Sequence, residues 1–369
     1  MNDRLRTIGI IGGYGTTGKI TTEYLIKNTD CQIIAAGKNP EKHAHWAKKY
    51  HDRVTLQKTD LYNNKQLQEL CASCGIIINA AGPSVLIGDR IAIQALDLNC
   101  HYIDLGGYDL LYDQLLQKNN LVLNKDLHFI IGAGWMPGVS GILPRHAIET
   151  ANSTFDRIES VKIYYGAVEA WSFNSSYDLA WASNQPFNGI YENGHWKPIN
   201  SSKLMHKKWF HEIGQRKSCN PFFDNQLKET ALNLKVNHFG TYVMLNDYRS
   251  ALSYLYNKLF LKNNRKKAAR MIEKDSKRLQ KKEGSWGLIT CEITGFTNNS
   301  KNTLKHSLAV EDNYYPTGIV PALAAKQIID SEIKNAGMDY LCQKVNPENF
   351  MEILGGCNIR YQTELYPSS

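Results

Sequence analysis

The stretch TIGIIGGYGTTGK, residues 7–19, decides the fold of this chain. An apolar strand pattern leads into a glycine-rich turn, and a helical pattern follows. The glycines satisfy GxGxxG at positions 13, 15 and 18 and GxxGxxG at positions 12, 15 and 18. Side chains at these places would block the tight turn, the approach of the backbone to a pyrophosphate, and the packing of helix on strand. The helix N-terminus after such a turn offers free N–H groups to phosphates. Strand, turn and helix together therefore predict a dinucleotide-binding site.

Strand-like and helical stretches alternate over the first third of the chain, a pattern typical of parallel strands joined by crossover helices. The expected strands are residues 7–11, 32–36, 54–58, 75–80, 101–105 and 127–132. Helices are expected near residues 17–27, 40–50, 64–71, 87–97 and 110–118. This alternation predicts an α/β fold, a Rossmann doubly wound parallel sheet.

The composition changes after residue 138. From about residue 152 the chain is rich in Tyr, Trp, Asn and Ser, with strand-like pieces at 158–165 and 288–294. An alanine-rich helix at 319–334 and a helix near 348–354 follow. We expect three segments: a Rossmann dinucleotide-binding domain at 1–138, an inserted α+β domain at 139–312, and a C-terminal return at 313–369 that packs on the Rossmann domain.

The end of the second strand bears on which dinucleotide binds. An NAD site places Asp or Glu about 20 residues after the glycine loop, against the ribose 2′-hydroxyl. This chain has Ile34-Ala-Ala-Gly37-Lys38-Asn39 there instead. Gly37 leaves room for a 2′-phosphate, and Lys38 supplies a cation, although without the bidentate fork of arginine. The missing carboxylate favours NADP(H). The alternative for Lys38 is a surface lysine in a turn.

Three further glycine-containing loops follow the fourth, fifth and sixth expected strands, at the edge where open α/β sheets bind ligands. They begin at Asn79, Asp104 and Gly132. Each alone is compatible with a structural turn, but three at one edge favour a binding site. The residues expected to bind the cofactor are Gly12, Gly13, Tyr14, Gly15, Thr16, Thr17, Gly18, Lys38, Asn39, Asp60, Asn79, Ala80, Ala81, Gly82 and Pro83.

The net charge of the 369 residues is +8, from 43 basic and 35 acidic side chains. Residues 262–283 hold ten Lys or Arg and three Asp or Glu, and so carry +7 of this charge. The segment predicts an amphipathic helix with a solvated basic face. The alternatives are an electrostatic contact with an acidic substrate or partner, or a weak contact with a membrane surface. Because the segment contains no aromatic residue, base stacking is disfavoured and no nucleic-acid partner is expected.

The sequence lacks the signals that are typical of several other classes of protein. No stretch approaches the roughly 18 apolar residues of a membrane helix, and the N-terminus runs straight into a strand pattern, so we expect no membrane partner and a cytoplasmic location. The eight cysteines are scattered, and the close pair Cys71 and Cys74 is interpreted as packed thiols. Neither HExxH nor an i, i+4 pair among the histidines of the middle domain occurs, so no metal is expected.

Several motifs, taken in order, resemble the saccharopine dehydrogenase-like family of NADP-binding reductases. They are IGGYGTTGK, AAGKNPEK, INAAGPS, HYIDLGG, GAGWMPGVSG and YYPTGIVPALAAKQIIDSEI. They cover the first 145 or so residues and the region 314–355, roughly half of the chain. The resemblance implies a Rossmann domain, an inserted α+β substrate and dimerisation domain that pairs subunits into a homodimer, and a C-terminal return to the first domain.

Better-studied members of this family form or cleave a secondary amine by NADP-linked reduction of an imine. By that analogy, Ser84 and Asp104 line the substrate cleft beside the nicotinamide, and Gly134 and Trp135 are expected there as well. Saccharopine reductases proper carry Cys and Asp where this chain has Ala133 and Met136. A role in lysine biosynthesis is therefore not expected.

These observations lead to two hypotheses. The first is an NADP-dependent oxidoreductase that reduces an imine, or a related C=O or C=C group, of an amino-acid-derived small molecule. An iminium substrate already carries the positive charge, whereas a carbonyl needs a proton donor. The catalytic candidates are Asp104, Tyr108 and Tyr164, and packing within a strand is the alternative for Tyr164. The second hypothesis is a non-catalytic NADP-sensing or scaffold protein with a Rossmann domain, because the fold does not decide between them.

Overall fold

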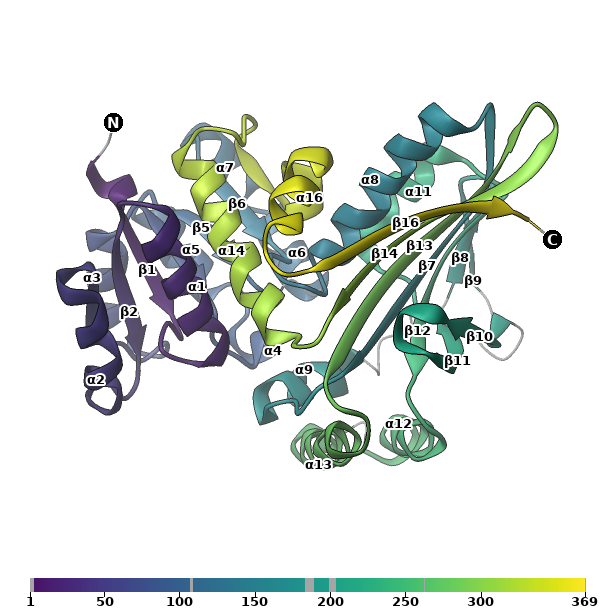
Figure 1. The fold of residues 1–369 in the computed structure, drawn as a ribbon. Helices are drawn as coiled ribbons and strands as arrows, with labels where there is room; N and C mark the ends of the chain where they lie inside the picture. The colour runs from purple at the N-terminus through teal and green to yellow at the C-terminus, as the bar shows by residue number, and fades with distance from the viewer. Residues whose placement is uncertain (1–2, 107–108, 183–188, 199–203, 262, 369) are drawn as a thin grey trace. The chain divides into compact units, whose positions relative to one another are not determined.

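The computed structural model describes residues 3–106, 109–182, 189–198, 204–261 and 263–368 (Figure 1). The chain divides into two compact units. Unit 1 consists of Met1–Val139 and Tyr314–Val345, and unit 2 of Ser140–Asn313 and Asn346–Ser369. The chain therefore passes from one unit to the other three times.

Unit 1 is built on a parallel sheet of seven strands among the described residues, in the order β15-β6-β5-β4-β1-β2-β3. The strands are β1 (Thr7–Ile11), β2 (Gln32–Gly37), β3 (Val54–Lys58), β4 (Ile76–Asn79), β5 (His101–Asp104), β6 (His128–Ile131) and β15 (Gly337–Tyr340). The order 3-2-1-4-5-6 is that of a doubly wound sheet, whose direction of winding reverses between β1 and β4. The predicted α/β fold class is confirmed.

Helices connect these strands as the sequence pattern predicts for parallel pairing. They are α1 (Thr16–Asn28), α2 (Ala44–Ala47), α3 (Asn64–Ser73), α4 (Ser84–Ile87), α5 (Arg90–Asp97), α6 (Asp109–Leu116), α7 (Asn119–Asn124), α14 (Tyr314–Ile329) and α15 (Leu341–Lys344), with 3₁₀ turns η1 (Asp3–Arg6), η2 (Pro40–His43) and η3 (Lys48–Arg53). The single helix expected over residues 40–50 is wrong. That stretch is η2, α2 and η3, and its end at His51 has a φ of +51°, which a helix cannot accommodate.

Helix α14 packs closely on α1 within unit 1. A Cβ at Gly318 would lie 2.6 Å from the Cβ of Ile20 and 2.9 Å from the carbonyl oxygen of Thr17. The hydroxyl of Thr21 donates to the carbonyl oxygen of Gly318 at 2.8 Å. The absence of a side chain at Gly318 thus lets α14 approach the helix that follows the glycine loop.

Unit 2 is built on a mixed sheet in the order β10-β11-β12-β7-β13-β14-β16, with β8 and β9 beside β12. Its strands are β7 (Arg157–Val168), β8 (Gly189–Glu192), β9 (His195–Pro198), β10 (His206–Phe210), β11 (Gln215–Pro221), β12 (His238–Leu245), β13 (Trp286–Thr297), β14 (Ser300–Val310) and β16 (Arg360–Pro367). Its helices are α8 (Val139–Thr154), α9 (Phe173–Ala182), α11 (Lys228–Leu234), α12 (Tyr248–Phe260), α13 (Arg265–Glu283) and α16 (Pro347–Gly355), with 3₁₀ turns η4 (His211–Ile213) and η5 (Asn225–Leu227). The expected second domain with strands near 158–165 and 288–294 is thus an α+β unit.

The C-terminal part of the chain is shared between the units. We expected residues 313–369 to return to the first domain as one segment. Only Tyr314–Val345 groups with unit 1, whereas Asn346–Ser369 groups with unit 2. The physical reason is β16, which extends the mixed sheet by antiparallel pairing with β14, from Asn302 opposite Pro367 to Ala309 opposite Arg360.

None of the helices in the described parts of the chain combines the length and the apolar character that crossing a bilayer requires.

Candidate functional site

The glycine loop between β1 and α1 is pressed against the loop that follows β4. Gly12 has a φ of +78°, a conformation that favours glycine. A Cβ there would lie 2.9 Å from the carbonyl carbon and oxygen of Ala80. A Cβ at Gly18 would overlap the carbonyl oxygen of Gly12, so α1 begins directly under the turn. The motif thus has the geometry that a dinucleotide-binding turn requires.

A cavity of about 820 Å³ opens in front of this loop. It is lined by Ile11, Gly12, Tyr14, Gly15, Thr16, Lys19, Ile20, Glu23, Gly37, Lys38, His43, Thr59, Leu61, Ala81 and Gly82. Seven of the predicted cofactor residues therefore face one cavity: Gly12, Tyr14, Gly15, Thr16, Lys38, Ala81 and Gly82. The other eight do not line it: Gly13, Thr17, Gly18, Asn39, Asp60, Asn79, Ala80 and Pro83.

Lys38 lies at the mouth of the cavity, where β2 ends. Its Nζ is 3.5 Å from Oδ1 of Asp60 and 5.7 Å from the centre of the Tyr62 ring. The Lys38 side chain is 59% exposed, so its ammonium can meet an entering anion. A backbone hydrogen bond from Tyr62 and the charge of Lys38 lower the pKa of the exposed Asp60 carboxyl. An incoming phosphate would compete with Asp60 for Lys38.

An aromatic pair forms one wall of the cavity beside Lys38. The rings of Tyr14 and His43 stack with centroids 4.4 Å apart, and the Tyr14 hydroxyl accepts a hydrogen bond from the backbone N–H of Asn39 at 3.0 Å. The sequence analysis did not identify His43, Lys19 or Thr59 as part of this site. The position of Thr59, directly after β3 at the same sheet edge, was an available signal. For His43 there was none, because the segment was expected to be helical.

Asp104 ends β5 and is buried, with 1% of its surface exposed. Its Oδ2 accepts hydrogen bonds from Nδ2 of Asn79 at 2.9 Å and from the hydroxyl of Tyr102 at 2.5 Å. Its Oδ1 accepts from the backbone N–H of Gly106 at 2.8 Å. Burial raises the pKa of the Asp104 carboxyl, and these hydrogen bonds oppose that shift. Asp104 therefore joins β4, β5 and the following loop through a closed network.

The loops after β5 and β6 are joined at Asp104 as well. The backbone N–H of Ala133 donates to the carbonyl oxygen of Asp104 at 2.9 Å. Ser84, at the start of α4, packs over Gly106, because a Cβ at Gly106 would lie 2.6 Å from the Ser84 hydroxyl oxygen. The structure thus brings Ser84 and Asp104, two predicted substrate residues, to the same point of the sheet edge.

Gly134 and Trp135, also predicted at the substrate, shape the loop after β6. The backbone N–H of Gly134 donates to the carbonyl oxygen of Pro137 at 3.0 Å. A Cβ at Gly134 would lie 3.2 Å from the carbonyl oxygens of both Leu105 and Pro137. Trp135 is buried and the following Met136 is 43% exposed.

The two tyrosine candidates differ from these residues. Tyr108 lies outside the described residues. Tyr164 lies on β7 of unit 2 and is 2% exposed, within an apolar cluster that contains Phe210 and Tyr242. Its hydroxyl is 3.3 Å from Nε2 of His206, and burial raises its pKa. Packing within a strand, the alternative that the sequence left open, describes its surroundings.

A second cavity, of about 750 Å³, lies on the sheet of unit 2. His206, His238 and Tyr242 line it, and Nε2 of His238 is 3.0 Å from the Tyr242 hydroxyl. Among the described residues, no group of three or more His, Cys, Asp or Glu side chains is arranged to hold a metal ion. All eight cysteines are buried free thiols.

Comparisons with known proteins agree with this geometry. Residues 8–126 match the family model of the saccharopine dehydrogenase NADP binding domain. The probable mitochondrial saccharopine dehydrogenase-like oxidoreductase of Arabidopsis thaliana is 26% identical over 111 residues, which are 27% of this chain and 24% of that protein. This chain thus matches about a quarter of the length of its curated relative.

The fold of the whole chain has a counterpart among solved structures. The apo form of saccharopine dehydrogenase (L-Glu forming) from Saccharomyces cerevisiae superposes with a TM-score of 0.70 at 12% identity, over 97% of this chain and 99% of that chain. Together with the family match of residues 8–126, this fold confirms the resemblance predicted from the motifs. The predicted cofactor is confirmed as well, because the segment that holds the glycine loop and Lys38 matches an NADP-binding domain.

Proposed function

We propose that this chain is an NADP-dependent oxidoreductase that reduces an imine, or a related C=O or C=C group, of an amino-acid-derived small molecule. The observation that carries the proposal is one cavity lined by both the glycine loop and Lys38, in a segment that matches a saccharopine dehydrogenase NADP binding domain. The similarity to saccharopine dehydrogenase-like proteins supports the imine as the substrate group.

The residues of unit 1 fit NADP(H). Gly12, Gly15 and Thr16 line the cavity at the N-terminus of α1, the end of a helix that favours a phosphate, so a pyrophosphate would lie there. Lys38 would pair with the 2′-phosphate, and Tyr14 with its stacked partner His43 would flank the adenosine. When bound, the reduced nicotinamide supplies a hydride.

Asp104 acts as a positioning residue in this proposal. Its carboxylate is buried and accepts three hydrogen bonds, so it holds the loop at Gly106 and the side chain of Asn79 in place. Ser84 packs against the same loop and presents a hydroxyl group at the sheet edge. Fixed loops at this edge are what a substrate needs in order to be held against a cofactor.

The proton requirement distinguishes the substrate classes. Reduction of an iminium carbon needs no proton during the transfer step, because the nitrogen already carries the charge. A carbonyl oxygen gains charge and requires a donor. Asp104 accepts three hydrogen bonds, and the Tyr164 hydroxyl lies against His206 beside an apolar cluster. We favour the iminium substrate, for which neither of these two side chains has to donate a proton.

A binding titration tests the cofactor part of the proposal. NADPH and NADH are titrated separately into the purified protein, with tryptophan quenching and nicotinamide emission as readouts. We expect NADPH to bind more tightly, and Lys38→Ala to weaken NADPH binding about tenfold or more, about 1.4 kcal/mol. Lys27→Ala removes the same charge from the exposed end of α1 and is the matched control. Failure of both nucleotides to bind would overturn the proposal.

A substrate panel tests the reaction. Oxidation of NADPH is followed with imines formed from amino acids and keto acids, and with carbonyl and activated alkene compounds. Turnover of the imines supports the proposal. Tight NADPH binding without turnover of any compound favours the non-catalytic NADP-sensing or scaffold protein instead. A homodimer and a cytoplasmic location remain predictions, which light scattering and cell fractionation test.

A further inference from the structure

Helix α12 of unit 2 presents its apolar side chains to solvent. Six large hydrophobic residues lie on one face, with exposed fractions from 42% for Tyr256 to 69% for Tyr248 and Phe260. They are Tyr248, Leu252, Leu255, Tyr256, Leu259 and Phe260. Their spacing of three and four residues places them along one stripe.

Among the α12 side chains that the structure describes, those on the other side of the helix are small or polar. Asn257 is buried, with 1% exposed, and Ser250, Ala251 and Ser253 are half-buried. A helix on the surface of a soluble protein normally turns its apolar stripe toward the core. In α12 the six apolar side chains of the stripe face solvent instead. Exposed apolar side chains that lie next to one another mark an interaction site.

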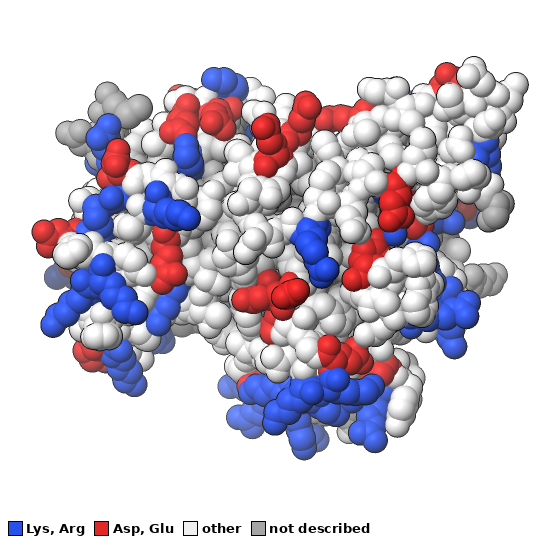
Figure 2. Space-filling model, viewed as in Figure 1, with Lys and Arg blue, Asp and Glu red and all other residues white. Residues whose placement is uncertain are grey.

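Helix α13, the next in the chain, presents cations. Its buried side consists of small and apolar residues such as Ala268, Ala269 and Leu279. Its exposed side carries Arg265, Lys266, Lys267, Arg270, Lys274, Lys277, Lys281 and Lys282. Six of these take part in no ion pair within the described residues: Arg265, Lys266, Lys267, Arg270, Lys274 and Lys281. Figure 2 shows Lys and Arg side chains gathered over α13 at the lower edge of the view.

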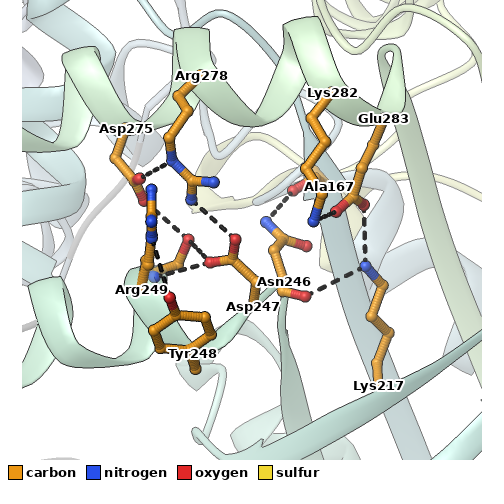
Figure 3. A network of polar contacts seen from close by, with 11 residues as sticks. Ala167, Lys217, Asn246, Asp247, Tyr248, Arg249, Asp275, Arg278, Lys282 and Glu283 are labelled. Atoms are coloured by element: carbon orange, nitrogen blue, oxygen red, sulfur yellow. Dashed lines mark hydrogen bonds and ion pairs between the residues drawn. The ribbon is translucent and has the colours of Figure 1, made fainter.

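The two helices are fixed side by side by a polar network (Figure 3). Asp247 caps α12 by accepting from the backbone N–H of Ser250 at 2.9 Å, and it accepts from Arg278 of α13 at the same distance. Asp275 of α13 accepts from Nε of Arg278 and from the Ser250 hydroxyl, both at 2.8 Å. The network therefore holds α12, with its exposed apolar stripe, beside α13, with its exposed cations, and we call these exposed side chains the α12–α13 surface.

We propose that the α12–α13 surface binds the surface of an anionic lipid membrane. Leucine and aromatic side chains enter the boundary between headgroups and acyl chains, while adjacent lysines and arginines attract lipid phosphates and carboxylates. The charge decides among the possible occupants. A second copy of this chain would bring two cationic helices together, whereas an anionic membrane offers negative charge for the cations and an apolar layer for the leucines. The inference replaces the expectation of no membrane partner with peripheral binding.

Vesicle flotation tests this proposal. The full chain is mixed with vesicles of phosphatidylcholine alone, or of phosphatidylcholine with phosphatidylserine, at low and high salt. We expect it to float with the anionic vesicles, to float far less with the neutral ones, and to be released by salt because screening weakens the attraction. Equal flotation with both vesicles, or no flotation with either, would overturn the proposal.

Two triple variants separate the two halves of the surface. Lys266→Glu with Arg270→Glu and Lys274→Glu should weaken binding to anionic vesicles about tenfold or more. The second variant combines Leu252→Ser, Leu259→Ser and Phe260→Ser. It should also weaken binding to anionic vesicles about tenfold or more, without changing the net charge. The control for charge is Lys48→Glu with Lys49→Glu and Lys65→Glu, all exposed in unit 1, and the control for apolar surface is Leu121→Ser.

Light scattering and thermal unfolding complete the test. All substituted side chains are exposed, so the variants should keep the melting temperature of the parent. Binding that survives both triple variants would overturn the proposal. Concentration-dependent self-association that the Leu252, Leu259 and Phe260 variant abolishes, without vesicle binding by the parent, would assign the surface to a second copy of the chain instead.

Discussion

The hydroxyl oxygen of Tyr14 lies 2.5 Å from the point where a Cβ at Gly37 would stand. The end of β2 therefore has no room for a side chain as long as the Tyr14 ring keeps its place against His43. This contact couples the glycine loop to the loop that carries Lys38, because the Tyr14 hydroxyl also accepts a hydrogen bond from the backbone N–H of Asn39.

We predict that Gly37→Ala weakens NADPH binding about tenfold, ~1.4 kcal/mol, because the methyl group displaces the Tyr14 ring from the cavity wall. Fluorescence titration measures the effect. In a Tyr14→Ala background the same substitution meets no ring and should cost much less, so a double-mutant cycle should give a coupling energy well above zero. Additive effects would contradict the contact.

Gly15 and Gly18 should respond differently to alanine. A Cβ at Gly15 would lie 3.1 Å from the carbonyl oxygen of Gly12, a contact that a small shift relieves, whereas a Cβ at Gly18 would overlap that oxygen. Because Gly15 lines the cavity, Gly15→Ala should impair NADPH binding with little change in melting temperature. Gly18→Ala should lower the melting temperature by several degrees. Thermal unfolding without nucleotide separates the two, and equal melting temperatures would count against this distinction.

The Asp104 network should be sensitive to an isosteric change. Asp104→Asn replaces an acceptor oxygen with an NH₂ group that faces donors from Asn79, Tyr102 or Gly106. We expect the free energy of unfolding to fall by about 1–3 kcal/mol, the cost of leaving buried polar groups unpaired. Urea unfolding checks this, with the exposed Asp113→Asn as a control that should change nothing.

The free energy of unfolding should fall in mild acid, because the buried His101 resists protonation in the folded chain. Its Nδ1 accepts from the backbone N–H of His128 at 3.0 Å, and burial together with His128 lowers the pKa of His101 to about 4. In the unfolded chain, His101 becomes protonated near pH 6.5, whereas in the folded chain it stays neutral down to about pH 4. The contribution of His101 to the free energy of unfolding is therefore complete above about pH 6.5 and is lost as the pH falls toward about 4. Urea unfolding across this window should show the loss. His101→Asn keeps an acceptor that does not titrate and should remove the part of the slope that His101 contributes. The buried His238 and His306, whose pKa values are also lowered to about 4, should contribute the rest. An unchanged slope would refute the assignment.

The end of α13 is held by a buried ion pair. Nζ of Lys217 on β11 is 3.2 Å from Oε2 of Glu283, and their side chains are 2% and 11% exposed. Lys217→Met leaves the largely buried Glu283 carboxylate with Lys282, 3.6 Å away, as its ion-pair partner, so this change alone should destabilise unit 2 by about 1–3 kcal/mol. The double variant with Glu283→Leu should recover most of this loss. Chemical unfolding of both proteins provides the comparison.

Unit 1 was predictable from the sequence to the extent that its strands are continuous apolar runs. Strands such as β4, which is buried along its whole length, carry this pattern because parallel sheets are covered on both faces. The strand β15 was missed because its sequence, Gly337-Met-Asp-Tyr340, contains no two consecutive apolar residues. The strand β16 was missed because its residues are largely exposed at a sheet edge and lack an apolar run.

The sequence predicted those residues of the site whose roles follow from the residues next to them in the chain. The turn at Gly12 and the cation at Lys38 follow from local spacing. The hydrogen bond that Asp104 accepts from Asn79 joins two neighbouring strands, β5 and β4, and no local pattern encodes it. His43 enters the cavity because residues 40–50 form broken turns, where the sequence favoured one helix.

The alternating passage of the chain between the units bears on how the protein is made. During synthesis the first 139 residues emerge with six of the seven strands of the parallel sheet, but α14 and β15 belong to Tyr314–Val345. Until the ribosome has passed that segment, β6 remains an open edge and α1 lacks the helix that packs on it. The nucleotide-binding unit is therefore completed only after Ser140–Asn313 of unit 2 has been made, and the mixed sheet receives its edge strand β16 later still.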